Sequence, residues 1–562
     1  MRLVPSVLVA VLVLGATRAE AQSSEQVERL ASLGQVWGFL KYHHPAVAKG
    51  TIDWDSALVA AVPRVNAART GAEFQAEIAS LLDAVGSAPP CAGEAITGRV
   101  DGRCRQDFPD SMRINLDLRW LSASKLLGTD ISRRLAEIRV NRHQGAGRYV
   151  KFGITAMFES DTAYRTPEYP AEGQRLLALF RFWNAARYYF PYMYVNGGDW
   201  NAVLPEFIPR LIQAKDATEY HLTVLELTAR LRDTHVSAGS AVIARALGVR
   251  LPVFEARSIE GKIVVWKLAP TAPPDGGGLR IGDVITHVDG RPVAQRRRDL
   301  AKYVAAGSPV TLERKLVQTI LRGQSDSTTY GIERDGKSLT IRLAMAPVPT
   351  SPPTPRTYPV AELAKVLPNS TLGYINMGDI NPAQVDSAFA IVKHTTGLVM
   401  DVRNYPRGTM YQFAALFNPD ARPFVKFTAV DSTYPGQVVW QAPMRAGYPS
   451  GNPNHYRGRI AILVDERTQS HAEFSVMALQ TAPENKVIGS QTAGADGNIT
   501  RFSLPGGVFT LFTGLGVYYP DGKETQRVGL VPDIEVRPTL KGFRAGRDEV
   551  LERAIEYLKS GR

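Results

Sequence analysis

Hydrophobic positions in the amino-terminal half of the chain recur with the period of an α-helix. Between residues 27 and 40 the apolar positions lie three to four apart, at Val27, Leu30, Leu33, Trp37 and Leu40. This spacing places them on one face of an amphipathic helix. Residues 547–559 at the other end of the chain repeat the pattern. We therefore predict a helical domain over residues 22–246 and a closing helix at the carboxyl end.

The helical half also contains an internal repeat. Five residues recur at a fixed offset of 146 positions: Trp37, Pro45, Trp54, Pro63 and Arg64 return as Trp183, Pro191, Trp200, Pro209 and Arg210. This predicts two copies of one helical unit. The copies differ at their ends, since the first closes on Asp83-Ala-Val85 and the second on Asp233-Thr-His235. Only the second copy has a histidine at this position.

Short strands replace the helical pattern over residues 247–346. Residues 262–266, 283–288 and 338–343 are rich in β-branched side chains and partly alternate in polarity. The stretch GLRIGDVITHVDGRPV (278–293) resembles the signature loop and strand of PDZ domains, and that resemblance implies peptide binding by strand addition. The PDZ carboxylate-binding loop has no clear counterpart here. The alternative is a small β domain that serves only as scaffold.

A proline-rich linker at residues 347–360 separates this region from the last domain, residues 361–562. Short apolar strands alternate with helical patterns there, at residues 371–376, 397–402, 460–464 and 486–489. Strands that are apolar throughout and separated by helices are typical of an α/β domain with a largely parallel sheet.

The amino-terminal segment and the net charge bear on the location and the partners of the protein. Arg2, an apolar stretch and an Ala19-Glu-Ala21 cleavage site predict a signal peptide over residues 1–21, hence a periplasmic or extracellular protein. A bare membrane anchor is the alternative, but the stretch is short for a bilayer. No stable membrane insertion is expected of the mature chain. The net charge is +12, but the basic residues are dispersed, which argues against nucleic-acid binding.

The chain has two cysteines, Cys91 and Cys104, in one glycine-containing loop. In an oxidising compartment a disulfide between them is favoured over two free thiols. A metal site is disfavoured because no histidine pair completes a tetrahedral shell.

Ser470 is the candidate nucleophile. A buried strand ends near Val464, a polar loop follows, and a helix begins at the serine. Free N–H groups at a helix start favour the negative charge that forms during acyl transfer. The plain alternative is a helix cap, because Ser470 and Glu473 form an S-x-x-E capping box.

The wider carboxy-terminal third is similar to the carboxy-terminal-processing (tail-specific) and tricorn serine peptidases. The resemblance rests on the Ser470 segment and on four motifs: 398–404 with Gly408, Gly489-Ser-Gln-Thr-Ala-Gly494, Tyr519-Pro-Asp-Gly522 and Gly529-Leu-Val-Pro-Asp533. It implies a fold of the Clp protease/crotonase type and hydrolysis of peptides or unfolded proteins without a cofactor. It also implies that the N–H groups of Gly408 and His471 form the oxyanion hole.

The resemblance leaves the base to be chosen. In the tail-specific branch a lysine follows the second glycine of the Gly-x-x-Thr-x-Gly motif, but Ala495 stands there. The tricorn branch uses a histidine placed before the PDZ domain, which fits His235, with Thr234 as a supporting hydroxyl. That branch also has a late glutamate, for which Glu524 is the candidate and Gln526 the alternative.

Two competing functions remain open. A catalytically silent peptide-binding protein would keep the fold and lose the base, and a crotonase-type acyl-thioester enzyme would need a coenzyme A pocket. No metal or phosphate-loop signature occurs. The sequence does not indicate an oligomeric state.

Overall fold

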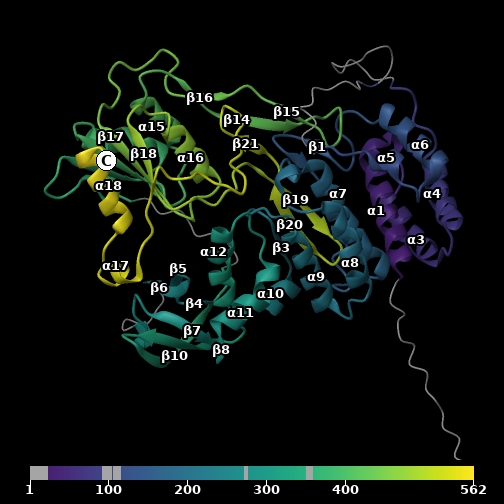
Figure 1. Ribbon diagram of the computed structural model, residues 1–562, viewed down its shortest axis with the longest axis horizontal. Coiled ribbons are helices and arrows are strands. Elements are labelled where there is room, and N and C mark those ends of the chain that lie inside the picture. Colours follow the sequence, from purple (N-terminus) through teal and green to yellow (C-terminus); the bar gives the residue numbers. More distant parts are fainter. Residues whose placement is uncertain (1–22, 92–103, 105–114, 271–275, 350–357) are drawn as a thin grey trace, which may run out of the picture.

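The computed structural model describes residues 23–91, 104, 115–270, 276–349 and 358–562. Three regions follow one another along the chain: a helical region, a small β domain and an α/β domain (Figure 1). In the described ranges, no helix has the length and apolar character needed to span a bilayer. The predicted signal peptide lies outside the described residues, as does most of the predicted linker.

Twelve helical segments precede the small β domain in the described residues, together with three short strands. Two long helices, α1 and α7, form the centre of this region and bury most of their side chains. The segments are α1 (Ser24–His43), α2 (Pro45–Ala48), α3 (Trp54–Ala67), α4 (Gly71–Val85), α5 (Trp120–Ala123), α6 (Gly128–Val140), α7 (Glu172–Tyr189), η2 (Met193–Val195), η3 (Trp200–Ala202), α8 (Val203–Ile212), α9 (Ala217–Ala229) and α10 (Ala241–Leu247), with strands β1 (Lys151–Phe152), β2 (Ala156–Met157) and β3 (Ser237–Gly239).

The two halves of the helical region share one local arrangement. The indole N–H of Trp37 donates to the carbonyl of Trp54, and the indole N–H of Trp54 donates back to the carbonyl of Trp37, both at 2.9 Å. Trp183 and Trp200 make the same reciprocal pair at 2.7 and 3.1 Å. Buried indoles need an acceptor, and this pairing satisfies both of them in each half. These are the tryptophans of the predicted repeat.

The helical region shares its core with a hairpin from the carboxy-terminal domain. Strands β19 (Ile499–Leu504) and β20 (Val508–Thr513) pair with each other, and β3 adds antiparallel to β20 with Leu511 opposite Ser237. Phe502 and Phe512 of the hairpin are buried in the helical core. The predicted boundary between residues 22–246 and 361–562 therefore does not separate two independent cores.

The small β domain contains one sheet in the order β4-β10-β9-β7-β6-β5, with β8 paired to β7. Strand β5 lies at the edge of that path, and helix α12 packs beside it. The elements are β4 (Arg250–Pro252), β5 (Phe254–Ile259), β6 (Lys262–Leu268), η4 (Gly276–Gly278), β7 (Val284–Val288), β8 (Arg291–Pro292), α11 (Val293–Leu300), η5 (Ala301–Tyr303), α12 (Pro309–Ile320), β9 (Ser327–Arg334) and β10 (Lys337–Pro347). Its PDZ character stays a prediction.

The carboxy-terminal domain is built on the predicted parallel sheet, in the order β11-β12-β13-β17-β18-β22. Only β11 runs antiparallel to its neighbour. The sheet strands are β11 (Ala364–Val366), β12 (Leu372–Asn376), β13 (Gly397–Asp401), β17 (Arg459–Val464), β18 (Asn485–Gly489) and β22 (Ile534–Glu535). A second, antiparallel sheet contains β14 (Arg422–Val430), β15 (Val438–Trp440), β16 (Met444–Ala446) and β21 (Gly516–Tyr518).

Helices cover the parallel sheet on both faces. One core contains α14, α15 and α16, and the other contains the closing helix, whose Val550, Ala554 and Leu558 pack on the sheet. The helices are α13 (Val360–Leu363), η6 (Pro382–Gln384), α14 (Val385–Val392), α15 (Met410–Phe417), α16 (His471–Leu479), α17 (Leu540–Arg544) and α18 (Glu549–Ser560).

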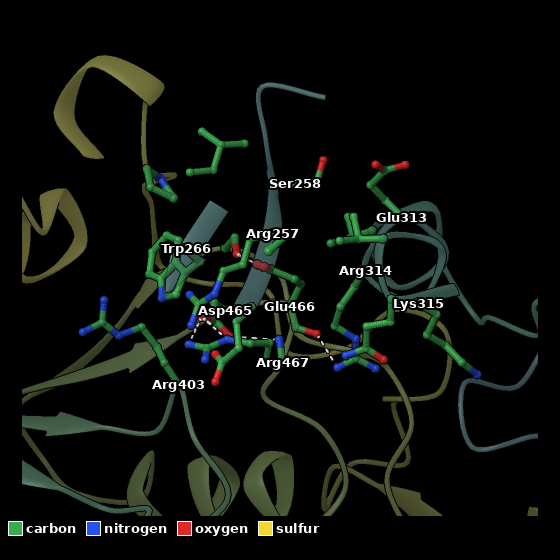
Figure 2. Close-up of a pocket in the computed structure, with 18 of the residues that line it drawn as sticks. Arg257, Ser258, Trp266, Glu313, Arg314, Lys315, Arg403, Asp465, Glu466 and Arg467 are labelled. Atoms are coloured by element: carbon green, nitrogen blue, oxygen red, sulfur yellow. Dashed lines mark hydrogen bonds and ion pairs between the residues drawn. The ribbon is translucent and has the colours of Figure 1, made fainter. Parts of the chain in front are cut away.

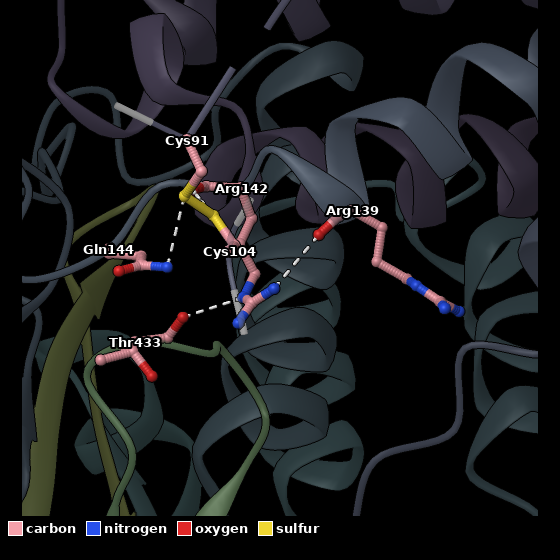
Figure 3. Close-up of a disulfide and its surroundings, with 6 residues drawn as sticks. All are labelled: Cys91, Cys104, Arg139, Arg142, Gln144 and Thr433. Carbon is pink, nitrogen blue, oxygen red and sulfur yellow. Dashed lines mark hydrogen bonds between the residues drawn. A yellow bond between two sulfur atoms is a disulfide. The ribbon is translucent and has the colours of Figure 1, made fainter. Parts of the chain in front are cut away.

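Cys91 and Cys104 form a disulfide bond, the pairing favoured from the sequence (Figure 3). The sulfur of Cys104 lies 3.4 Å from the carbonyl of Arg142. The guanidinium of Arg142 in turn lies over the ring of Tyr434 and donates to the carbonyl of Thr433 at 2.8 Å. The disulfide thus sits where the helical region contacts a loop of the carboxy-terminal domain.

Candidate active site

Ser470 occupies a sharp turn between β17 and α16. Its φ of 57° and ψ of −127° are unusual for a residue with a side chain. Such strained backbone persists only where the surroundings hold it, and it clusters at functional sites. The N–H of Ser470 donates to the carbonyl of Ala495 at 2.9 Å and also approaches the Glu473 carboxylate at 3.3 Å. The turn therefore holds the serine at the amino end of α16, as predicted for a nucleophile.

Glu473, in the first turn of α16, is fully buried and stabilises the turn at Ser470. Its carboxylate accepts hydrogen bonds from the Thr492 hydroxyl at 2.5 Å, the Gly494 N–H at 2.8 Å and the Ala495 N–H at 3.0 Å. Burial raises the pKa of Glu473, and these donors oppose that rise. The predicted Gly-x-x-Thr-x-Gly motif thus has a physical role, because it supplies the donors that anchor the nucleophile helix.

Gly408, the predicted oxyanion residue, lies in the loop after β13. Strands β13 and β17 are parallel neighbours, so their carboxyl ends meet at one edge of the sheet. The Thr468 hydroxyl joins the two loops by donating to the Val402 carbonyl at 3.0 Å. Gly408 has a φ of 78°, which favours glycine, and a Cβ there would meet nothing within 4 Å.

The second predicted oxyanion donor is the N–H of His471, at the first position of α16. The ring of His471 lies 6.1 Å from that of Tyr405, three residues before Gly408. Across the described residues, the N–H groups of Gly408 and His471 make no hydrogen bond. Both donors are thus free to meet a developing negative charge.

His235 follows α9, the last long helix of the helical region, and lies two residues before β3. Its Nδ1 lies 2.8 Å from the hydroxyl of Thr513, the last residue of β20. The Thr513 hydroxyl donates to Asp233 Oδ1 at 3.0 Å, and the Thr513 N–H donates to Asp233 Oδ2 at 2.8 Å. Gln526 Nε2 donates to the same carboxylate at 3.0 Å, as does the His235 N–H at 3.1 Å.

This network fixes the tautomer of the imidazole. Backbone N–H groups and the Gln526 Nε2 group can only donate, so Asp233 acts as an acceptor. The single proton of the Thr513 hydroxyl is given to Asp233, which leaves its oxygen to accept from His235 Nδ1. The proton of the neutral ring therefore resides on Nδ1, and Nε2 carries the lone pair. Nε2 makes no hydrogen bond to any described residue.

Burial lowers the pKa of His235 below its usual 6.5. The carboxylate of Asp233 opposes this shift, whereas the positive charges of Lys315 and Arg314 add to it. The ring therefore stays neutral, and able to accept a proton, at lower pH than an ordinary histidine does.

The base loop and the nucleophile loop meet through short contacts. The Thr234 hydroxyl lies 3.4 Å from the Ala493 carbonyl, and the Ala493 N–H donates to Thr468, two residues before Ser470. His235 and Gln469 line one cavity of about 1690 Å³, which lies between the small β domain and the carboxy-terminal domain. No hydrogen bond joins the Ser470 hydroxyl to the His235 ring in the part of the chain that the structure describes.

The edge strand β5 and helix α12 form one wall of this cavity, and the loop before Ser470 faces them (Figure 2). Arg257 of β5 stacks on Trp266 at 3.5 Å and lies 3.8 Å from Asp465. Figure 2 shows Arg314 of α12 pointing toward Glu466, to whose carbonyl it donates.

Glu524, the predicted third member of the site, does not join the hydrogen-bond network around His235. Glu524 accepts a hydrogen bond from the hydroxyl of Tyr194 at 3.0 Å, and among the described residues it makes no hydrogen bond to His235 or Thr234. Gln526, the alternative, does join the network, but through Asp233. The Thr234 hydroxyl accepts from the Gly307 N–H at 2.9 Å and supports the backbone rather than the imidazole.

Sequence reasoning missed Asp233 and Thr513 as functional residues. Asp233 was visible as the acidic residue two before the histidine, present in both copies of the repeat. Thr513 gave no signal, since it comes from a strand 278 residues away along the chain.

Comparison with known proteins bears on this site. Residues 371–536 match peptidase family S41. Tricorn protease homolog 2 of Streptomyces coelicolor is 24% identical over 423 residues, which cover 71% of this chain and 32% of that protein. The chloroplastic C-terminal processing peptidase of Tetradesmus obliquus is 25% identical over 367 residues, or 61% of this chain and 73% of that protein. This chain thus spans about a third of the length of the Streptomyces relative.

The fold also matches a solved structure. Mature CPAF in complex with lactacystin superposes with a TM-score of 0.52 at 14% identity, covering 70% of this chain and 99% of that one. At that identity the match concerns the fold alone.

Proposed function

We propose that the protein is a serine peptidase that cleaves peptides or unfolded proteins through an acyl-enzyme on Ser470, because residues 371–536 match peptidase family S41. The observation that carries this proposal is the Asp233–Thr513–His235 network, which presents a neutral imidazole on the cavity that the nucleophile loop also lines. Such a network is what a general base requires.

The reaction follows from the roles of the groups. His235 Nε2 takes the proton of the Ser470 hydroxyl as its oxygen attacks the scissile carbonyl. The N–H groups of Gly408 and His471 bind the resulting oxyanion. The imidazolium then protonates the leaving amine, and the acyl-enzyme forms. Water, deprotonated by the same imidazole, hydrolyses the ester and releases Ser470.

The cavity provides the path by which a substrate chain reaches Ser470. Strand β5 pairs only with β6 among the described strands, so its other edge is open to an extended peptide. Side chains of β5 and α12 line the cavity together with Gln469. We expect an extended segment to add to β5 and continue toward the nucleophile, in keeping with the predicted PDZ-like role.

A periplasmic or extracellular location is part of the same proposal. It rests on the apolar segment that precedes Ala19-Glu-Ala21 and on the disulfide between Cys91 and Cys104, a bond that persists in oxidising compartments.

Two observations favour a second candidate function. The Ser470 hydroxyl has no hydrogen bond to His235 within the described residues, and the lysine of the tail-specific branch is replaced by Ala495. A silent peptide-binding protein would show the same features. In peptidases without substrate, however, the catalytic hydrogen bond is often long and tightens only in the complex.

A fluorophosphonate probe, which reacts with activated serines, separates these functions. The wild-type protein is expected to be labelled, and Ser470→Ala to lose the label. His235→Ala is expected to retain its fold and lose labelling. Ser475→Ala is the control, because it removes a different hydroxyl from the same helix, one that donates to the His471 carbonyl. Absence of labelling in a folded wild-type protein would support the binding protein instead.

A further inference from the structure

Two neighbouring cations on α12 contact the two halves of the proposed active site. Lys315 is partly buried, and its ammonium donates to three carbonyls: Ala305 at 2.6 Å, Thr234 at 3.0 Å and Val236 at 3.3 Å. Thr234 and Val236 are the residues on either side of His235. An ammonium has three protons, and this one gives two of them to the backbone that carries the base and the third to Ala305.

Arg314, the preceding residue, contacts the other half. Its guanidinium donates to the Glu466 carbonyl at 2.8 Å and to Gln469 Oε1 at 2.5 Å. Gln469 immediately precedes Ser470. Both bonds start from a charged donor and are therefore stronger than neutral ones.

The surroundings show that these contacts are specific. Burial lowers the pKa of Lys315 to about 8 and also lowers the pKa of Arg314, so the protein bears a cost in keeping both charges there. The carboxylate of Asp233 opposes the fall in the pKa of Lys315, and those of Glu466, Asp465 and Glu473 oppose the fall in the pKa of Arg314. Lys315 makes no ion pair with any described acidic residue. Its hydrogen bonds go to backbone carbonyls instead.

We propose that Arg314 and Lys315 are positioning residues, through which α12 of the small β domain sets the distance between the His235 imidazole and the Ser470 hydroxyl. This inference rests on the proposed peptidase function. It gives the small β domain a part in the chemistry itself, because one helix turn holds the loop of the base with one side chain and the loop of the nucleophile with the next.

The residues act on alignment, so their removal is expected to lower kcat rather than to weaken binding. A small ester such as p-nitrophenyl acetate tests this directly, because it acylates the serine without needing the long groove. We expect Arg314→Ala and Lys315→Met each to lower kcat at least about 10-fold, the loss of one charged hydrogen bond, with KM little changed. Arg314→Lys, which keeps the charge and one donor, is expected to recover part of the loss.

The pH profile gives a second readout. Asp233 raises the pKa of His235, and Lys315 and Arg314 lower it. Removing the Lys315 charge therefore moves the acid limb of kcat/KM to higher pH, which a general loosening of the fold would not do. Arg298→Met removes an exposed cation of the same domain, bonded only to Gln295 among the described residues, and is the matched control.

The alternatives are distinguishable. If Arg314→Ala does not fold, Gln469→Met removes the acceptor instead and is expected to lower kcat in the same way. The proposal is overturned if these variants hydrolyse the ester with the kcat and acid limb of Arg298→Met while Ser470→Ala is inactive. Should the wild-type protein itself neither hydrolyse the ester nor react with fluorophosphonate, the peptidase function fails, and this inference fails with it.

Discussion

The hydroxyl of Thr513 offers the sharpest test of the proposed base. Thr513→Val replaces the hydroxyl with a methyl group of the same shape, so the packing of β20 is kept. His235 Nδ1 then loses its acceptor, and Asp233 loses one of its four hydrogen bonds. The ring is free to hold its proton on either nitrogen, and only one tautomer can act as the base.

The size of the effect follows from when the lost bond matters most. The bond from Nδ1 is neutral in the resting protein and becomes charged when the imidazole takes the serine proton. A hydrogen bond from a charged group contributes about 1.5–3 kcal/mol, so kcat is expected to fall about 10- to 150-fold. KM should change little, because the bond strengthens in the transition state rather than in substrate binding.

Thr510→Val is the matched control. Thr510 is buried on the same strand, and its hydroxyl donates to the Ser237 carbonyl at 3.0 Å, away from the imidazole. Both variants lose one buried hydroxyl and should unfold at similar urea concentrations. The assay is steady-state hydrolysis of p-nitrophenyl acetate near neutral pH. Equal kcat values for the two variants would refute the role of Thr513, and His235 would then not be oriented as described.

Three further predictions follow from the geometry. Replacing Cys91 and Cys104 with serine removes a cross-link between residues 13 apart and should lower the free energy of unfolding by about 3 kcal/mol in urea, an effect that reducing agent should reproduce in the wild-type protein only. Because burial lowers the pKa of His235, the acid limb of kcat/KM should lie below pH 6.5, and a limb above that value would contradict the observed burial. Glu473→Gln turns an amide N–H toward backbone donors. It should lower the free energy of unfolding by about 1–3 kcal/mol and abolish fluorophosphonate labelling. Replacing the exposed Glu484 with glutamine should change neither quantity.

The sequence predicted the parts of the site that depend on local pattern. The strand before Ser470 is apolar from Ile460 to Val464 and the helix after it has a capping box, so the turn between them was visible without the fold. Four of the six strands of this sheet, β12, β13, β17 and β18, lie within one or two residues of their predicted positions, since each is a short buried run bounded by turn residues.

The parts that depend on pairing between distant segments could not be predicted. Whether Thr513 faces His235 depends on the register between β3 and β20, which places Leu511 opposite Ser237. A shift of one residue would turn the hydroxyl to the other face of the hairpin. Glu524 was preferred to Gln526 because it is a carboxylate, and nothing in the local sequence shows that Gln526 is the residue that reaches Asp233.

The addition of β3 to the β19–β20 hairpin has a consequence for when the protein can first act. The base is made about halfway through synthesis, and the hairpin that receives it comes after the nucleophile. In a growing or unfolding chain, Ser470 and His235 are therefore not held together by this pairing, and the proposed site is not assembled. The order of assembly alone would thus delay the proposed activity until this hairpin is in place.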